Sequence, residues 1–177
     1  RQHFKTPRVH IMSYAQLSRP SEDCVLANLT KPYPPDKILI VADEAHMLKR
    51  LESARTMRVV RFLQKNKGVT FVPLSGTMTS KGIKDFAHLA EMALRDSSPL
   101  PRNKHDLEAW GQCLDVSGRP NQADWARFGP LLHWGCVDQR LPCSYGPTSH
   151  SYSKVDRART VFQHRMRTAP GVVASRQ

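Results

Sequence analysis

The chain has 177 residues and a mass of 20.1 kDa, which is enough for one domain with a core and too little for two full-sized domains. Hydrophobic residues make up 40% of it, which argues against wholesale disorder, and no apolar run approaches the roughly 18 residues that a membrane span needs. The 27 Lys and Arg against 15 Asp and Glu give a formal net charge of +12. This excess favours polyanionic partners, nucleic acid first and an anionic membrane surface second.

Six elements are expected in residues 1–96, alternating between strands and helices. They are a strand at 9–13, at most a short helix around 26–29, a strand at 38–42, a helix at 52–66, a strand at 70–74 and a helix at 82–95. The run 38–42 (ILIVA) is continuously apolar, which is typical of a strand covered on both faces in a parallel sheet. The order strand, helix, strand, helix predicts parallel strands joined by right-handed crossovers.

The composition changes after Asp96, where residues 97–103 (SSPLPRN) are typical of a linker. The elements expected beyond it are a helix around 107–114, a short helix around 125–132 that Pro130 ends or kinks, a loop at 135–153 and a last helix around 155–166. We therefore expect an α/β fold in residues 1–96 and a helical appendage in residues 97–177.

The cysteines favour a reducing compartment. None of Cys24, Cys113, Cys136 and Cys143 belongs to a C-x-x-C pair, which is typical of free thiols in a chain of this length. Residue types that bind zinc are present at His133, Cys136, Cys143 and His150. The gaps of three, seven and seven residues between them do not match a standard zinc knuckle. Packed cysteines and surface histidines are therefore the favoured interpretation, with a zinc-stapled interaction domain as an alternative.

The segment ILIVADEAH (38–46) places two acids at the end of an apolar strand. In a parallel sheet, ligands bind beyond the carboxyl ends of the strands. There Asp43 can hold a Mg²⁺ ion that bridges nucleotide phosphates, and Glu44 can orient or deprotonate an attacking water. An apolar strand followed by Asp-Glu is common, but the added Ala45 and His46 make a DEAH sequence, which is much rarer by chance.

A second motif, SGT at Ser75, Gly76 and Thr77, follows the next predicted strand. Alone, this motif is typical of a turn or a helix cap. Because neighbouring parallel strands end at the same edge of a sheet, we expect it to lie beside the DEAH sequence. The hydroxyls of Ser75 and Thr77 could then hydrogen-bond His46 or Glu44 and sense the state of the phosphates.

These motifs resemble a known family. The DEAH sequence, together with SYAQLS (13–18), SGTMTS (75–80) and GIKDFAHLAEMAL (82–94), resembles the first RecA-like domain of a superfamily 2 helicase or translocase of the Swi/Snf and phage DEAH-box types. Residues 158–175 resemble the segment that follows this domain in bacterial and phage members. The resemblance implies an incomplete, parallel-sheet RecA-like P-loop NTPase half-domain with a helical C-terminal appendage.

The resemblance also implies cofactors, partners and residue roles. ATP and Mg²⁺ would be the cofactors, nucleic acid (DNA more than RNA) the partner, with no membrane involved, and a bacterial or phage-infected cytoplasm the location. Asp43 would be the Mg²⁺ ligand, Glu44 the catalytic base and His46 the link to the SGT motif. The residues that would couple hydrolysis to movement are Ser75, Gly76 and Thr77. A family motif that lies near the nucleic acid matches Ser13 and Tyr14.

Two parts of such a motor are missing from the sequence. No G-x-x-x-x-G-K-[ST] loop occurs, so the loop that cradles the phosphates is absent, and the family places this loop before the SY segment. No second RecA-like domain is recognisable, and the run QHRMR (163–167) only superficially resembles the motif that carries its arginine finger. Because the chain also begins at Arg1, we expect an internal fragment that is inactive without the remainder of the helicase chain.

The charge supports a competing hypothesis, a non-enzymatic basic module that binds nucleic acid and carries vestigial ATPase motifs. The basic helix expected at 52–66 could contact phosphates or carry ordinary solvated charge through Arg55, Arg58, Arg61 and Lys65. The two hypotheses differ in their dependence on ATP. A steep salt dependence of DNA binding without any effect of ATP favours the module.

Overall fold

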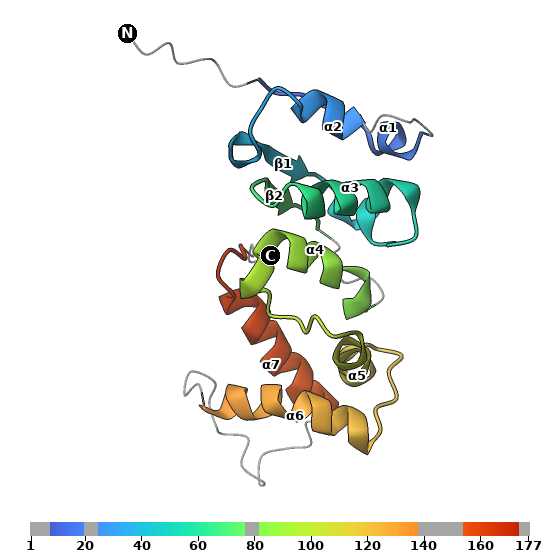
Figure 1. Cartoon of the computed structure of the whole chain (residues 1–177). Coiled ribbons are helices and arrows are strands. Elements are labelled where there is room, and N and C mark those ends of the chain that lie inside the picture. The colour runs from blue at the N-terminus through green and yellow to red at the C-terminus, as the bar shows by residue number, and fades with distance from the viewer. Residues whose placement is uncertain (1–7, 20–24, 77–81, 138–153, 174–177) are drawn as a thin grey trace. The chain divides into compact units, whose positions relative to one another are not determined.

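The computed structural model describes residues 8–19, 25–76, 82–137 and 154–173. Its contacts divide the chain into two compact units, Arg1–Ser75 and Gly76–Gln177 (Figure 1). Composition placed the boundary between residues 96 and 97, whereas the contacts place it after Ser75, because side chains from residues 83–90 share a core with the later helices. None of the helices in the described ranges combines the length and the apolar character that crossing a bilayer demands.

The first unit contains a parallel pair of strands joined by a helix (Figure 1). Its elements are α1 (Tyr14–Ser18), α2 (Val25–Thr30), the 3-10 turn η1 (Pro35–Lys37), β1 (Leu39–Ala42), the 3-10 turn η2 (Ala45–Leu48), α3 (Ala54–Lys65) and β2 (Thr70–Pro73). In the register of the pair, Leu39 lies opposite Thr70 and Ala42 lies opposite Pro73. The strands predicted at 38–42 and 70–74, their parallel pairing and the helix between them are confirmed.

Local interactions explain where α3 begins and ends. Ser53 caps its first turn, because the Ser53 hydroxyl accepts a hydrogen bond from the Thr56 amide at 3.4 Å. At the other end, the Asn66 side chain donates to the Phe62 carbonyl at 2.8 Å. The helix is amphipathic, and its buried apolar side consists of Val59, Val60, Phe62 and Leu63.

Within the described part of the first unit, one face of the strand pair is covered and the other is exposed. Ala42 and Phe71 are buried, whereas Leu39 and Val41 are 61% and 53% exposed. The prediction that residues 38–42 are covered on both faces is therefore wrong. Successive side chains of a strand point to opposite faces, so a strand covered on one face leaves every second residue in solvent.

Residues 9–13 do not form the predicted strand. They have no regular structure before α1, and Val9 and Ile11 are 82% and 95% exposed. A strand needs a neighbour with which it exchanges backbone hydrogen bonds, and within the described residues the sheet consists of β1 and β2. A β-branched composition does not replace that missing neighbour.

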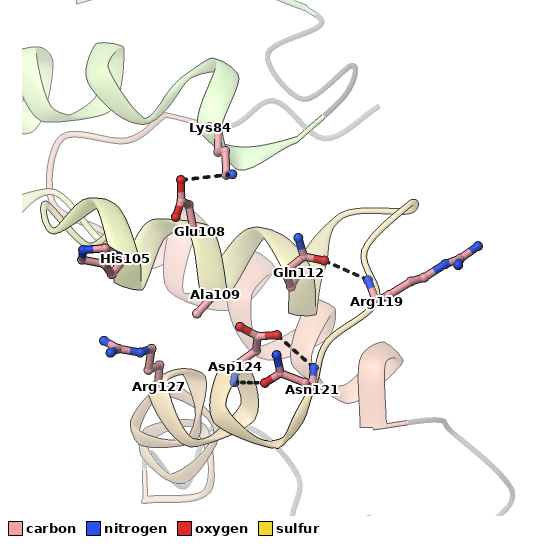
Figure 2. Close-up of a pocket in the computed structure, with 9 residues that line it drawn as sticks. All are labelled: Lys84, His105, Glu108, Ala109, Gln112, Arg119, Asn121, Asp124 and Arg127. Atoms are coloured by element: carbon pink, nitrogen blue, oxygen red, sulfur yellow. Dashed lines mark hydrogen bonds and ion pairs between the residues drawn. The ribbon is translucent and has the colours of Figure 1, made fainter.

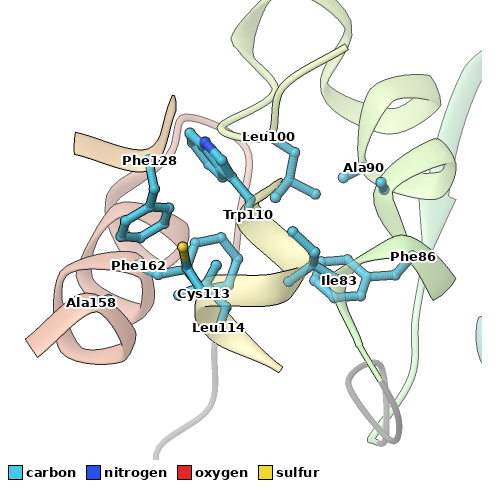
Figure 3. Packing of buried hydrophobic residues seen from close by; sticks show 11 residues of the cluster. Ile83, Phe86, Ala90, Leu100, Trp110, Cys113, Leu114, Phe128, Ala158 and Phe162 are labelled. Atoms are coloured by element: carbon cyan, nitrogen blue, oxygen red, sulfur yellow. The ribbon is translucent and has the colours of Figure 1, made fainter. Parts of the chain in front are cut away.

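The second unit is helical and has its own core (Figure 3). Its elements are η3 (Ile83–Asp85), α4 (Ala87–Leu94), η4 (Arg95–Ser97), α5 (Lys104–Leu114), α6 (Gln122–Val137) and α7 (Lys154–Thr168). Phe128 is completely buried, and its ring meets those of Trp110 and Trp125 edge to face at centroid distances of 5.4 and 6.0 Å. Cys113 belongs to the same cluster, and burial raises the pKa of its thiol to about 11.

Two helices of this unit differ from their predicted form. The helix expected at 82–95 is split into η3 and α4, because Phe86 has φ −124° and ψ −3° and interrupts the helical run. The short helix expected at 125–132 does not end at Pro130, since α6 continues to Val137. Proline removes one backbone donor, and the packing of α6 against both α5 and α7 outweighs that local cost.

Candidate functional site

The DEAH sequence and Ser75 follow neighbouring strands of one sheet. Two backbone hydrogen bonds join the two segments where the strands end. The Leu74 amide donates to the Ala42 carbonyl at 2.9 Å, and the Ala45 amide donates to the Leu74 carbonyl at 2.8 Å. The ladder thus continues past both strands and holds the two turns against each other. Ser75 therefore lies beside the DEAH sequence, as the order of the strands predicted.

Glu44 has a left-handed backbone conformation, with φ 49° and ψ 48°. This region costs a residue with a β-carbon roughly 1–2 kcal/mol, and glycine is the usual occupant. One local hydrogen bond supports the turn, from the Glu44 amide to Asp43 Oδ1 at 3.0 Å. Backbone outliers of this kind concentrate at functional sites. No residue pattern signals it, because glutamate has no preference for this conformation.

His46 contacts residues of both motifs. Its Nδ1 atom lies 3.0 Å from Glu44 Oε2 and 3.4 Å from Ser75 Oγ. A carboxylate only accepts hydrogen bonds, so the shorter contact requires a proton on Nδ1. The Nδ1–H group then donates to Glu44 and, at the longer distance, to the Ser75 oxygen. Ser75, His46 and Glu44 form a connected series between the turns that follow two strands.

The two acids are exposed, and each uses one carboxylate oxygen within the protein. Asp43 Oδ1 accepts the Glu44 amide, and Glu44 Oε2 faces His46. Their second oxygens, Asp43 Oδ2 and Glu44 Oε1, make no hydrogen bond with any residue that the structure describes. These two oxygens are therefore the atoms that can meet a cation or a water molecule from solvent.

Helix α1 also contacts the DEAH turn. The Tyr14 hydroxyl donates to the Asp43 carbonyl at 2.6 Å. Burial raises the pKa of Tyr14, and the nearby carboxylates of Asp43 and Glu44 raise it further, so the hydroxyl keeps its proton and can donate. Ser13 caps α1, accepting from the Gln16 amide at 3.4 Å, while the Gln16 side chain accepts from the Ser13 amide at 2.8 Å. That Ser13 and Tyr14 lie near nucleic acid stays a prediction.

We expect Tyr14→Phe to lower the free energy of unfolding of the first unit by about 1 kcal/mol, because it removes the hydrogen bond to the Asp43 carbonyl. Tyr33→Phe is the matched control, since the hydroxyl of Tyr33 has no hydrogen-bond partner among the described residues. Native-state hydrogen exchange at the amides of β1 and β2 across a urea series measures the change. Equal losses in the two variants would show that the Tyr14 hydroxyl has no special role.

The structure does not bring every predicted site residue together. Gly76 is exposed and begins the second unit, and Thr77 lies outside the described residues. The side chains of the four zinc candidates also lie outside them, namely His133, Cys136, Cys143 and His150. Within the described part of the chain, no three His, Cys, Asp or Glu side chains are grouped so as to hold a metal ion.

The second unit has a polar pocket that no sequence motif indicated (Figure 2). Its volume is about 520 Å³, and its lining consists of Lys84, His105, Glu108, Ala109, Gln112, Arg119, Asn121, Asp124 and Arg127. Two of the lining residues, Lys84 and Glu108, form an ion pair at 3.9 Å, and the side chain of Arg119 extends away from the other labelled residues (Figure 2). The lining comes from three separate segments, so no local spacing could have revealed the pocket. Acids and bases are mixed there, and the charges select no ligand class.

No family model, curated protein or solved structure matched this chain. The chemistry of the site is therefore the basis for its function. That chemistry consists of two solvent-facing carboxylates, an imidazole and a hydroxyl, all located where two parallel strands end.

Proposed function

We propose that this chain supplies the Walker B and SGT part of the first RecA-like motor domain of an ATP-dependent nucleic-acid helicase or translocase. The observation that supports the proposal is the series Ser75, His46 and Glu44, in which one imidazole nitrogen meets side chains from the turns after two adjacent strands. Such a series can transmit a change at the nucleotide to the neighbouring strand, because hydrogen-bonded groups polarise and position one another.

Asp43 is the residue proposed to hold Mg²⁺. It directly follows β1, its side chain is exposed, and its Oδ2 atom has no hydrogen-bond partner among the described residues. Mg²⁺ at nucleotide sites is held by one or two carboxylates together with phosphate oxygens and water, so a single aspartate at the end of a strand fits this ion. When bound, Mg²⁺ supplies positive charge that neutralises the phosphates of ATP.

Glu44 is the proposed general base. Its Oε2 atom is engaged with His46, which leaves Oε1 to orient a water molecule and accept its proton. Two contacts hold Glu44 in position, the one with His46 and the Tyr14 hydrogen bond to the adjoining Asp43 carbonyl. A base that is already held in place has little conformational freedom to lose when it orients the water.

This chain does not supply the loop that would bind the phosphates. The 177 residues contain no G-x-x-x-x-G-K-[ST] loop, whose backbone amides and lysine bind the phosphates in P-loop enzymes. The proposal therefore assigns this loop and the second motor domain to other parts of the natural polypeptide. Nucleic acid, DNA more than RNA, is the proposed track, and a bacterial or phage-infected cytoplasm is the proposed location.

The test compares the complete natural reading frame with the 177-residue chain in an assay of phosphate release. We expect the complete protein to hydrolyse ATP only with Mg²⁺ and faster when DNA is added, because the missing loop is then present. We expect the 177-residue chain to show no activity above background. A complete protein without DNA-stimulated hydrolysis, or a 177-residue chain that is equally active, would contradict the proposal.

A further inference from the structure

The segment 49–67, which contains α3 and its flanks, is unusually basic. It holds seven basic residues, namely Lys49, Arg50, Arg55, Arg58, Arg61, Lys65 and Lys67, and one acid, Glu52, so its formal charge is 7 − 1 = +6. Half of the chain's net charge of +12 therefore lies in this one segment. Within α3 itself no acidic residue is present. None of the roles proposed for the DEAH and SGT motifs uses this charge.

Three of the cations share one side of α3. At about 100° per residue, Arg58, Arg61 and Lys65 fall within about 60° of arc around the helix axis. Arg61 and Lys65 are exposed, and Arg58 is half-buried. We call these three residues the basic face of α3. On the opposite side of the helix lie the buried residues Val59, Val60 and Leu63.

The charge of the basic face is not compensated within the described part of the chain. The Arg58 guanidinium donates a hydrogen bond to the Leu17 carbonyl, which ties α3 to α1 but adds no negative charge. Arg61 and Lys65 form no ion pair with any described residue. Unpaired cations at neighbouring positions create a positive potential that extends into solvent and attracts anions.

Helix α3, which carries the basic face, follows the candidate site in the chain and packs against α1. Burial raises the pKa of Tyr14, the charges of Asp43 and Glu44 raise it further, and Arg55 in the first turn of α3 opposes them. Arg55 therefore acts on the Tyr14 hydroxyl, which donates to the Asp43 carbonyl. Helix α1, which carries Tyr14, also packs along α3. A ligand on the basic face would thus lie on the helix that directly follows the candidate site.

The chemistry of the face favours the phosphate backbone of nucleic acid over a membrane. Duplex DNA carries one negative charge per about 1.7 Å of its axis, and the basic face extends over about 10 Å of helix. A helix that binds membranes exposes Trp, Phe or Leu beside its cations, whereas the one aromatic residue of α3, Phe62, is buried. Because Phe62 is buried, the basic face has no aromatic ring that could stack against bases.

We propose that the basic face of α3 binds the phosphate backbone of nucleic acid without reading its sequence. Arg61 and Lys65 supply the principal contacts, because both are exposed and unpaired among the described residues. The choice of nucleic acid as partner rests on the proposed function. The contact itself involves no ATP, so it can be tested separately from hydrolysis.

The experiment measures binding of the 177-residue chain to a fluorescently labelled, mixed-sequence DNA duplex over a salt series without ATP. Each phosphate contact contributes about 0.9 to the slope of log K against log salt concentration. Arg61→Gln combined with Lys65→Gln is therefore expected to reduce that slope by about 2. Because the contacts are to phosphates, duplexes of unrelated sequence are expected to lose affinity equally.

Arg157→Gln combined with Arg167→Gln is the matched control, since it removes the same charge from two exposed residues of another helix, α7. Glutamine is a good helix former, and circular dichroism checks that each double variant is folded. A second variant, Arg61→Lys with Lys65→Arg, keeps both charges and is expected to retain the original slope.

Three results would overturn the proposal: an unchanged slope in the Arg61 and Lys65 double glutamine variant, an equal change in the control, or a loss of slope in the charge-preserving variant. If the double glutamine variant binds DNA as before but no longer binds phosphatidylcholine–phosphatidylserine vesicles, the basic face binds membranes, and this result would also overturn the proposal. If the expected slope change appears while the complete protein shows no DNA-stimulated ATPase activity, the basic face is supported and the proposed function alone is contradicted.

Discussion

Replacing Glu44 with glutamine is expected to reduce ATP hydrolysis by the complete protein by about 10²- to 10⁴-fold, which is the usual contribution of a positioned general base. Glutamine has the same shape, and its amide oxygen can still accept the Nδ1–H group of His46. The contact between His46 and Ser75 is therefore kept, and the proton-accepting carboxylate is lost. ATP binding is expected to be unchanged, because the proposed function assigns it to a phosphate loop elsewhere in the polypeptide and to Asp43.

Glu52→Gln is the control for this variant, since Glu52 is an exposed acid of the same unit and its substitution removes the same charge. Phosphate release gives the rate of hydrolysis, and equilibrium titration with a fluorescent ATP analogue gives the affinity. Hydrolysis by Glu44→Gln close to the original rate would exclude Glu44 as the base. Equal losses in the two variants would point instead to the net charge of the unit.

Phe128→Ala is expected to lower the free energy of unfolding of the second unit by about 3–5 kcal/mol, the usual cost of truncating a buried phenylalanine. Phe128 is completely buried and makes edge-to-face contacts with Trp110 and Trp125, so the substitution removes these contacts and leaves a cavity. Since small domains are stable by only about 5–15 kcal/mol, this loss removes a large part of the stability of the unit.

Hydrogen exchange resolved by residue measures this effect. We expect the amides of α5 and α7 to lose protection in Phe128→Ala, while those of β1 and β2 keep theirs, because the two sets of elements belong to separate compact units. Val116→Ala is the control, since Val116 is 93% exposed. A simultaneous loss of protection in β1 and β2 would show that the units do not unfold independently.

Elements with a strong periodic pattern could be predicted from the sequence. The apolar runs at 38–42 and 70–74 and the amphipathic helix between them led to a parallel strand pair, which the structure contains. The helix could be predicted because the repeat of its buried positions is set by helix geometry, and the strands because short apolar runs bounded by turn residues are typical of strands. The strand predicted at 9–13 is wrong because a strand also depends on a neighbour elsewhere in the chain.

The candidate site could be predicted only in part. The residue types and their places after two strands indicated that Ser75 lies beside the DEAH sequence. The left-handed conformation of Glu44, the contact of one His46 nitrogen with two side chains, and the Tyr14 hydrogen bond to the Asp43 carbonyl carried no sequence signal. Each of these features depends on how a side chain or the backbone is oriented in the folded protein, and the spacing of residues along the chain does not specify that orientation.

The local sequence pattern is enough to predict β1, α3 and β2 around the DEAH motif and the charge of α3, because periodicity and formal charge are local properties. The folded chain is needed to see which face of β1 is covered, that residues 83–90 pack with the later helices, and which side chains surround His46. These features depend on contacts between residues far apart in the chain, and such contacts form when apolar faces are buried together.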